Sequence, residues 1–220
     1  LFLSDTMTFW HDRISLTGGF RYQNILSNSY GYGSGELQST YNSDAFSPVI
    51  GLVIHPVKHV ALYFNRIQGL SAGTVVGASY VNAGQVFAPY QSTQYEVGAK
   101  YDIGRFSAGV AFYQTAMPSG MVEAYGNTGQ TIYTQNGQQR NRGMELTFNG
   151  EIIHGLRFNG GLTLIDAKQV NGDTSAQNGK TIVGVPNSTI NGNLESDMPS
   201  LKGPTFVRPV LSPGKHQCNV

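Results

Sequence analysis

Charged side chains are scarce in this 220-residue chain. They make up 12% of it, about half the share found in soluble domains, so a surface exposed only to water would be hard to keep in solution. The net charge is +1 and no basic block occurs, which argues against a nucleic-acid partner. Cysteine is nearly absent, and Cys218 alone cannot form an internal disulfide.

Long apolar runs are missing as well. No segment approaches the roughly 18 to 20 continuous apolar residues of a membrane-spanning helix. The first residues show neither a basic segment nor a cleavage site, so any export signal is expected to lie outside this sequence. The chain is therefore either soluble, or it crosses a membrane as strands.

Glycine and aromatic residues are abundant, at 28 residues and 11% of the chain. Many of them stand in segments where apolar and polar residues alternate with a period of two. In residues 13–23, Phe20 shares a face with apolar neighbours and Arg21 with polar ones, and the pattern recurs in residues 105–113 and 156–164. Each segment is about as long as a tilted membrane-spanning strand, which needs roughly 9 to 11 residues.

The links between these segments alternate in length. Short ones fall at about residues 10–13, 55–58, 102–105, 150–155 and 197–202. Long polar ones fall at about residues 24–45, 67–92, 116–140 and 167–184. Aromatic residues stand near the expected strand ends, as at Phe9, Trp10, Tyr22, Tyr101 and Phe148. This pattern is typical of an outer-membrane β-barrel with short periplasmic turns and long extracellular loops. A soluble β-sandwich with one wet face would show the same alternation.

One segment carries a more specific signal. In Ala88–Tyr101 a proline-containing loop re-enters the sheet at a strand with Glu96, Gly98 and Lys100. Shorter motifs support it: Gly19–Tyr22, Ser47–Pro48 with Gly51, Leu62–Tyr63, Gln139–Gly143 with Glu145, Gly161–Thr163 before Asp166–Ala167, and Gly184–Pro186. Together they resemble the barrel of TonB-dependent siderophore receptors, most closely the ferrichrome (ferric-hydroxamate) type. Gln23 and Ser196 depart from the family pattern.

The resemblance implies an all-β fold. We expect an antiparallel transmembrane β-barrel segment, about ten strands of a larger, roughly 22-stranded barrel, and hence an internal fragment of the barrel domain. Residues 1–196 are expected to form the partial barrel. Residues 197–220 are expected to be a degenerate, poorly ordered continuation, because they hold four of the nine prolines and proline cannot donate to a strand ladder.

The resemblance also implies a function. The parent protein is expected to import ferric siderophores across the outer membrane of a Gram-negative bacterium. Its implied partners are the siderophore, outer-membrane lipid, its own plug domain and the TonB complex. No resident cofactor and no catalytic residue are expected. A passive porin-type channel is the first alternative, and a soluble β-sandwich that binds a ligand is the second.

Two sets of residues are candidates for contact with the transported ligand. Aromatic rings on the loops offer flat apolar area with a polar tip, suited to an amphipathic metal chelate. They are Tyr30, Tyr32, Tyr41, Tyr80, Phe87, Tyr90, Tyr125 and Tyr133. Charged residues expected to face the lumen are Arg21, Glu96, Lys100 and Glu145. Ordinary loop composition explains the aromatic residues equally well, and pairing with one another or with the plug explains the lumen charges better than a role in transport.

A metal site and a hydrolase function are weaker hypotheses. The histidines His11, His55, His59 and His154 sit in or beside short turns with no carboxylate or cysteine at ligand spacing, so solvated turn residues are the simpler interpretation. Acidic residues that might serve a hydrolase, such as Asp44 or Asp166, have no histidine on a neighbouring loop end and no serine in a nucleophile turn. The sequence therefore predicts neither a metal site nor an enzyme.

Overall fold

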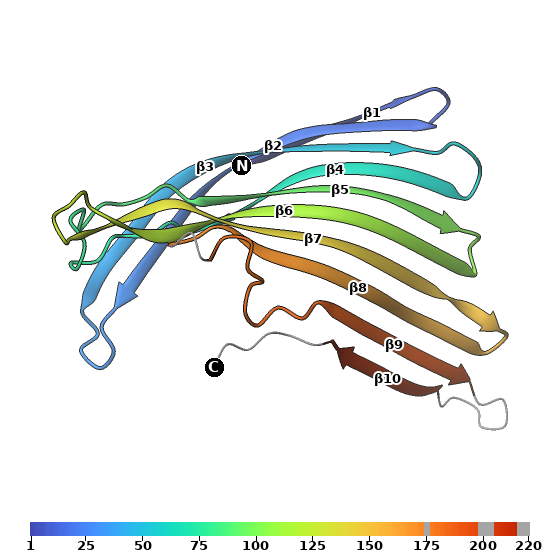
Figure 1. Ribbon diagram of the computed structural model, residues 1–220. Coiled ribbons are helices and arrows are strands. Elements are labelled where there is room, and N and C mark those ends of the chain that lie inside the picture. The colour runs from blue at the N-terminus through green and yellow to red at the C-terminus, as the bar shows by residue number, and fades with distance from the viewer. Residues whose placement is uncertain (174–176, 198–204, 215–220) are drawn as a thin grey trace.

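The computed structural model describes residues 1–173, 177–197 and 205–214, and within them the chain forms one sheet of ten antiparallel strands in sequential order. The sheet is curved, with tight turns at one end of the strands and longer connections at the other end (Figure 1). The strands are β1 Phe2–Phe9, β2 Ile14–Tyr30, β3 Leu37–Ile54, β4 Val60–Ser71, β5 Tyr90–Asp102, β6 Phe106–Ala124, β7 Thr131–Ile153, β8 Leu156–Asn171, β9 Ser188–Asp197 and β10 Thr205–Pro213.

One face of the sheet is apolar. Residues paired across neighbouring strands form continuous rows on it, and one row reads Met7, Leu16, Leu52, Phe64, Val97, Phe112, Met144 and Leu164. Large side chains of this face stay exposed, including Phe64, Val97 and Phe112. Within the described residues no second layer covers them, which contradicts the β-sandwich alternative and fits a barrel wall that faces lipid.

The opposite face is polar and carries the residues between those rows. The adjacent row reads Thr6, Thr17, Gly51, Asn65, Glu96, Tyr113 and Gly143. Because side chains alternate between faces along a strand, a single register fixes both surfaces at once. In a partial barrel, the polar face lines the lumen.

The tight turns at one end of the strands agree with the predicted short links. Three consecutive residues of the first turn, Trp10, His11 and Asp12, have left-handed backbone angles, with φ of 56°, 55° and 61°. The turn before β8 contains Gly155 at φ 80°. Such angles let the chain reverse within a few residues, as periplasmic turns of a barrel must.

Two of the predicted long loops are wrong. Residues 24–45 and 116–140 are mostly strand, because β2 pairs with β3 as far as Tyr30, and β6 pairs with β7 as far as Ala124. These hairpins continue beyond the apolar rows, and on one face of β3 there Tyr41 and Ala45 are buried. Backbone hydrogen bonds hold them there, and the sequence shows no hydrophobic alternation to announce them. The connections at 72–89 and 172–187 are long, as predicted.

Aromatic side chains gather toward both ends of the apolar face. Phe148 lies between Phe106 and Phe158, with ring centroids 4.5 and 5.6 Å away. At the other end, Phe20 stacks on Phe46 at 5.1 Å. Paired aromatic bands are typical of the two membrane interfaces of a barrel. Among the described residues, no helix is long and apolar enough to cross a membrane.

The proline-rich end of the chain contributes one strand. β10 pairs with β9 from Thr205 to Pro213, with Pro209 opposite Asn193. Proline is compatible with a strand that is paired on one side only, and among the described residues β10 pairs with β9 alone. Much of the segment expected to be poorly ordered, residues 198–204 and 215–220, lies outside the described residues.

Candidate functional site

The connection between β4 and β5, residues 72–89, folds back on the sheet, and we call it the strap. It forms a small hairpin of its own, in which Val76 N–H donates to Gln85 C=O at 2.9 Å. Asn82 then fastens it to β7 with two hydrogen bonds. Its Nδ2 donates to the Tyr133 carbonyl at 2.8 Å, and its Oδ1 accepts from Tyr133 N–H at 3.1 Å. Gln135 Nε2 adds a bond to the Ala88 carbonyl at 3.0 Å.

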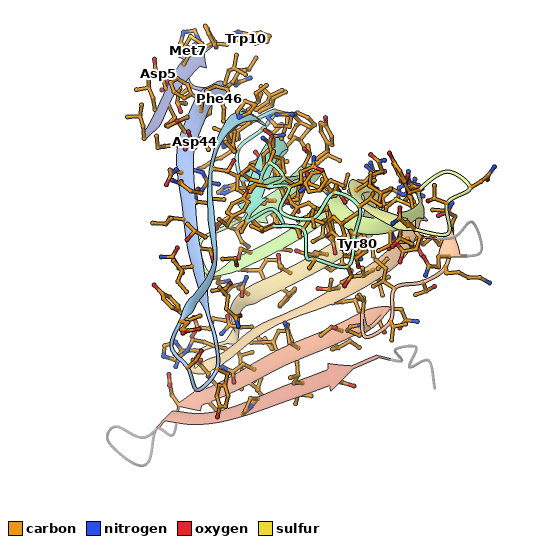
Figure 2. The ribbon with its side chains drawn as sticks, turned by 90° about the vertical axis from the view of Figure 1, so that its left-hand side faces the viewer. Asp5, Met7, Trp10, Asp44, Phe46 and Tyr80 are labelled. Atoms are coloured by element: carbon orange, nitrogen blue, oxygen red, sulfur yellow. The ribbon has the colours of Figure 1, made fainter. Side chains whose placement is uncertain are left out.

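The strap brings together aromatic residues that are far apart in the sequence. The ring of Tyr133 lies 5.7 Å from that of Tyr80 and 5.9 Å from that of Phe87, in tilted contacts. The hydroxyl groups of Tyr133, Tyr90 and Thr74 form a triangle of hydrogen bonds with sides of 3.1 to 3.2 Å. Tyr80 lies on the strap, on the side of the molecule where the long connections lie (Figure 2). These four aromatic residues are named the strap cluster: Tyr80, Phe87, Tyr90 and Tyr133.

The environment of Tyr133 favours its neutral phenol. Burial raises the pKa of the Tyr133 hydroxyl, the hydrogen bond with Thr74 opposes that shift, and the hydrogen bond with Tyr90 reinforces it. The hydroxyl therefore remains a hydrogen-bond donor and acceptor over the physiological pH range. A side chain at Gly120 would collide with this phenol, so any larger residue there would displace the Tyr133 ring.

A fifth predicted aromatic residue lies under the strap. Tyr41 of β3 is only 4% exposed, and Gly73 approaches its hydroxyl so closely that a Cβ there would stand 2.9 Å from it. The other three predicted loop aromatics do not join the cluster. Tyr30, Tyr32 and Tyr125 are exposed at the tips of the β2–β3 and β6–β7 hairpins. Geometry thus separates the eight candidates into five that meet at the strap and three that stand alone.

The predicted lumen charges fall on the polar face, and two of them share partners. Glu96 accepts hydrogen bonds from the Tyr63 hydroxyl at 2.8 Å and from Gln94 at 3.1 Å. Lys100 places its ammonium 5.2 Å from the centre of the Tyr63 ring. Glu145 lies on the same face, opposite Ala111 in the β6–β7 register. Part of this polar network is therefore satisfied within the barrel wall.

Arg21 is separate from these residues. It pairs with Phe2 and Ser47 on β1–β3, whereas Glu96 and Lys100 are on β5. With Gln68 and Ile67 it lines a small hollow of 320 Å³. Arg21 thus lies on the polar face of the sheet, on a different strand from Glu96 and Lys100.

Several residues of the site were not among the candidate site residues predicted from the sequence. Tyr63 organises the polar face, and its place in the alternation of β4 was the signal that would have found it. Asn82 and Thr74 fix the strap, but nothing in their sequence context distinguishes them from other polar loop residues. Asn82 bonds to Tyr133, which is 51 positions away in the sequence, and Thr74 bonds to the same residue at a separation of 59 positions.

The described residues contain no group of three or more His, Cys, Asp or Glu side chains placed to hold a metal ion. What the site does offer is a partly exposed aromatic surface at the strap, next to a polar inner face. Aromatic rings with hydroxyl tips can contact an amphipathic organic molecule through both apolar area and hydrogen bonds. The arrangement suits capture of a ligand.

Comparisons with known proteins agree with one another. A family model described as TonB dependent receptor-like, beta-barrel, matches residues 1–200. The ferrichrome receptor FcuA of Yersinia enterocolitica is 33% identical over 224 residues, which cover 100% of this chain and 29% of FcuA. The chain therefore spans less than a third of the length of that relative.

Solved structures share the fold. The ferric preacinetobactin receptor BauA of Acinetobacter baumannii superposes with a TM-score of 0.79 at 28% identity, covering 94% of this chain and 30% of BauA. The alcaligin outer-membrane receptor FauA of Bordetella pertussis superposes with a TM-score of 0.74 at 18% identity, covering 97% and 36%. At that identity, the likeness to FauA supports the fold alone.

Proposed function

This chain belongs to the TonB-dependent receptor β-barrel family, and we propose that its parent protein is a receptor that imports a ferric siderophore. Receptors built on this barrel reside in the outer membrane of Gram-negative bacteria, and the bare apolar face of the sheet fits that location. The chain contributes part of the barrel wall, with the strap at the end where long loops meet the outside.

The observation that carries this proposal is the strap cluster. Four aromatic side chains from the strap, β5 and β7 converge at the loop end of the sheet, and the hydroxyl groups of Tyr90 and Tyr133 are close enough to hydrogen-bond. A ferric siderophore is a large, partly apolar chelate that arrives from water. Rigid aromatic residues bind such molecules at a low cost in side-chain entropy.

The polar face has a different role in this proposal. Tyr63, Glu96 and Lys100 are engaged with one another, so we assign them to the stability of the wall and to the surface that the plug domain contacts. Energy would reach the plug from the TonB complex at the periplasmic end. No catalytic residue and no resident cofactor enter this scheme, and iron is cargo.

Binding of ferrichrome, a ferric hydroxamate, to the purified full-length receptor tests the proposal. Phe87→Ala removes a ring of the strap cluster without removing a hydrogen bond, and it should weaken binding about tenfold, a typical loss for a buried aromatic contact. Tyr32→Ala is the matched control, because Tyr32 is an aromatic of the loops that lies outside the cluster and is fully exposed.

Equal affinity in wild type and Phe87→Ala would remove the strap cluster from the ligand site. Failure of the wild-type receptor to bind ferrichrome or ferric siderophores of the catecholate and citrate classes would remove the receptor function itself. A passive channel would instead give steady ionic conductance in a planar bilayer without any such ligand.

A further inference from the structure

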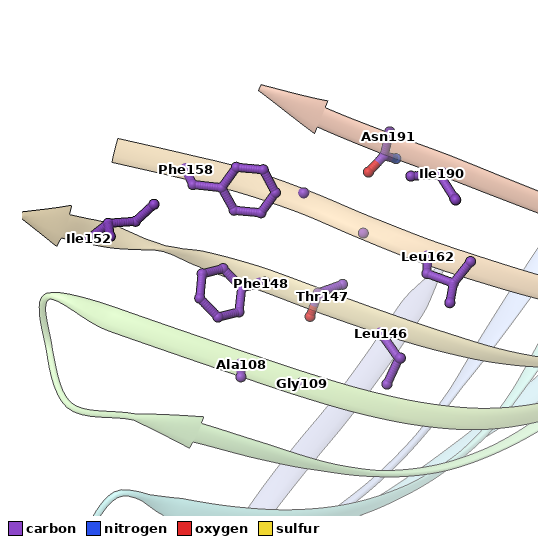
Figure 3. A pocket seen from close by; sticks show the side chains of 12 residues that line it. Ala108, Gly109, Leu146, Thr147, Phe148, Ile152, Phe158, Leu162, Ile190 and Asn191 are labelled. Atoms are coloured by element: carbon purple, nitrogen blue, oxygen red, sulfur yellow. The ribbon is translucent and has the colours of Figure 1, made fainter. Parts of the chain in front are cut away.

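The hollow beside Arg21 differs from hollows that are confined to one face of the sheet. A hollow of 740 Å³ on the apolar face is walled by apolar side chains such as Phe148, which places it on the lipid-facing surface (Figure 3). The hollow of 320 Å³ is instead lined from both faces, by Arg21 and Ser47 on the polar side and by Pro48 and Gln68 on the opposite side. It therefore lies within the wall, between β3 and β4.

A proline ends the pairing of β3 with β4. The last pair joins Ile50 to Arg66, and the next hydrogen-bonded pair would join Pro48 to Gln68. Proline has no N–H to donate to a ladder. Beyond this point no described residue of β3 pairs with β4, and the outer ends of β2 and β3 diverge from the other strands (Figure 1). We call this opening the split.

The split leaves backbone groups of β3 without partners. The N–H of His55 donates to the Arg13 carbonyl at 2.8 Å, so odd-numbered residues of β3 bond to β2 and even-numbered residues point toward β4. Phe46 and Asp44 are the next even-numbered residues beyond Pro48, and among the described residues their N–H and C=O groups have no hydrogen-bond partner. A strand edge of this kind can pair with another strand.

Polar side chains in the split also lack partners. Ser47 is 4% exposed, and its hydroxyl has no hydrogen-bond partner among the described residues. Gln68 donates through Nε2 to the Thr93 hydroxyl at 3.1 Å, but its buried Oε1 accepts no bond from the described part of the chain. Arg21 lines the same hollow and forms no ion pair with any described acidic residue. Buried polar groups normally have partners, so these side chains indicate a ligand that supplies both a donor and an acceptor.

We propose that the split accepts one extended peptide strand of a partner protein at the cell surface. The peptide pairs with the free edge of β3, and because side chains alternate along a strand, it turns one set toward Arg21 and Ser47 and the other toward Pro48 and Phe46. Its inward residue is acidic, since a carboxylate forms charge-assisted hydrogen bonds with a guanidinium. Its outward residues are apolar and contact the proline and phenylalanine rings. The split shares no residue with the strap cluster, so the proposal does not depend on siderophore binding.

Fluorescence anisotropy with the purified full-length receptor tests this site. The probe is fluorescein-labelled Thr-Val-Glu-Val-Thr, in which the glutamate faces inward and both valines face outward. The valine N–H groups are the ones that would donate to β3, because residues paired across strands share a face. A peptide with both valines N-methylated should therefore bind about 30-fold more weakly, since two ladder bonds are lost. A peptide with lysine in place of glutamate should show no binding, because it brings a second cation to Arg21.

Receptor variants test the two halves of the site separately. Arg21→Gln should weaken binding of the glutamate peptide about tenfold, the loss expected for a hydrogen bond to a charged group. Pro48→Val should abolish binding, because valine can donate to Gln68 and let the ladder close the split. The Gln68 amide should then gain protection from hydrogen exchange. The matched control is Lys58→Gln, which removes a cation from the turn at the opposite end of the sheet and should bind the peptide as wild type does.

Failure of the wild-type receptor to bind the glutamate peptide would overturn the proposal. Equal binding of the lysine peptide or of the N-methylated peptide would also overturn it, as would wild-type affinity in Arg21→Gln or Pro48→Val. Folding of each variant is checked by its heat-modifiable migration on a gel. Should Pro48→Val not fold, Arg21→Gln and the two control peptides still decide the outcome.

Discussion

Removal of the Asn82 side chain should release the strap while leaving the barrel wall intact. Asn82→Ala deletes both hydrogen bonds to the Tyr133 backbone, at 2.8 and 3.1 Å, and it also deletes the contact between Asn82 Nδ2 and Gln85. Tyr133 of β7 is the wall residue to which Asn82 forms these bonds, and the strands keep their own pairing without them. The effect should therefore remain local to residues 72–89.

The size of the effect follows from the bonds lost. A hydrogen bond within a protein contributes about 1 kcal/mol net, so loss of the two bonds to Tyr133 should lower the free energy of strap opening by about 2 kcal/mol. That difference corresponds to about a 30-fold change in the equilibrium between docked and open strap. Amide hydrogens that exchange through strap opening should lose protection by the same factor.

Hydrogen exchange of the full-length receptor measures this directly. The amide of Val81, which donates to the Thr131 carbonyl of β7 at 3.1 Å, should exchange about 30-fold faster in Asn82→Ala, while those in the paired centre of β7 should not change. Asn127→Ala, in the exposed tip of the β6–β7 hairpin, is the control. Unchanged protection of the strap in Asn82→Ala would refute its role as the fastening residue, and uniform loss across the sheet would show that the variant is globally destabilised.

Other outcomes follow from the same contacts. Glu96→Gln and Lys100→Met should each lower the free energy of unfolding, by about 1.5 and about 0.7 kcal/mol, with ferrichrome affinity unchanged; a selective loss of uptake would give these residues a transport role. His11→Gly should raise the free energy of unfolding by up to about 1 kcal/mol, because φ is 55° there. The denaturation midpoint should rise accordingly, and a lower midpoint would show that the turn needs the side chain. The raised pKa of Tyr133 keeps its phenol neutral in the folded state, so its contribution is complete below pH about 10 and is lost as the pH rises through its folded-state pKa. The number of late-ionising tyrosines in an ultraviolet titration should therefore fall by one in Tyr133→Phe, and an unchanged curve would contradict that assignment.

The strand pattern was predictable because membrane and lumen impose opposite requirements on alternate residues. Leu16, Val97 and Leu146 fall on the apolar face as the period-two pattern predicts, and the register of all neighbouring strands agrees. Beyond the membrane that constraint ends. The outer halves of β2 and β3 are rich in serine, asparagine and threonine and do not alternate regularly, and so they were mistaken for loop.

The site was predictable only by residue type. Tyrosine in a long loop is a reasonable candidate for ligand contact. Tyr133 and Tyr125 belong to the same hairpin, however, and their side chains lie in different environments. Tyr133 is held by a strap that arrives from 51 residues earlier in the chain, whereas Tyr125 stays exposed at 48%. Contacts of that sequence separation depend on the folded path of the strap, which no local pattern encodes.

The central claim is that one face of this sheet contacts lipid and the other contacts the wet interior. Nitroxide labels placed one at a time at residues 144 to 149 of the full-length receptor in bilayers, with Cys218 replaced by serine, test it most directly. Labels at Met144, Leu146 and Phe148 should collide preferentially with oxygen dissolved in the lipid, and labels at Glu145, Thr147 and Asn149 with a water-soluble nickel complex. Loss of this alternation, or shielding of the apolar positions from both reagents, would contradict the account.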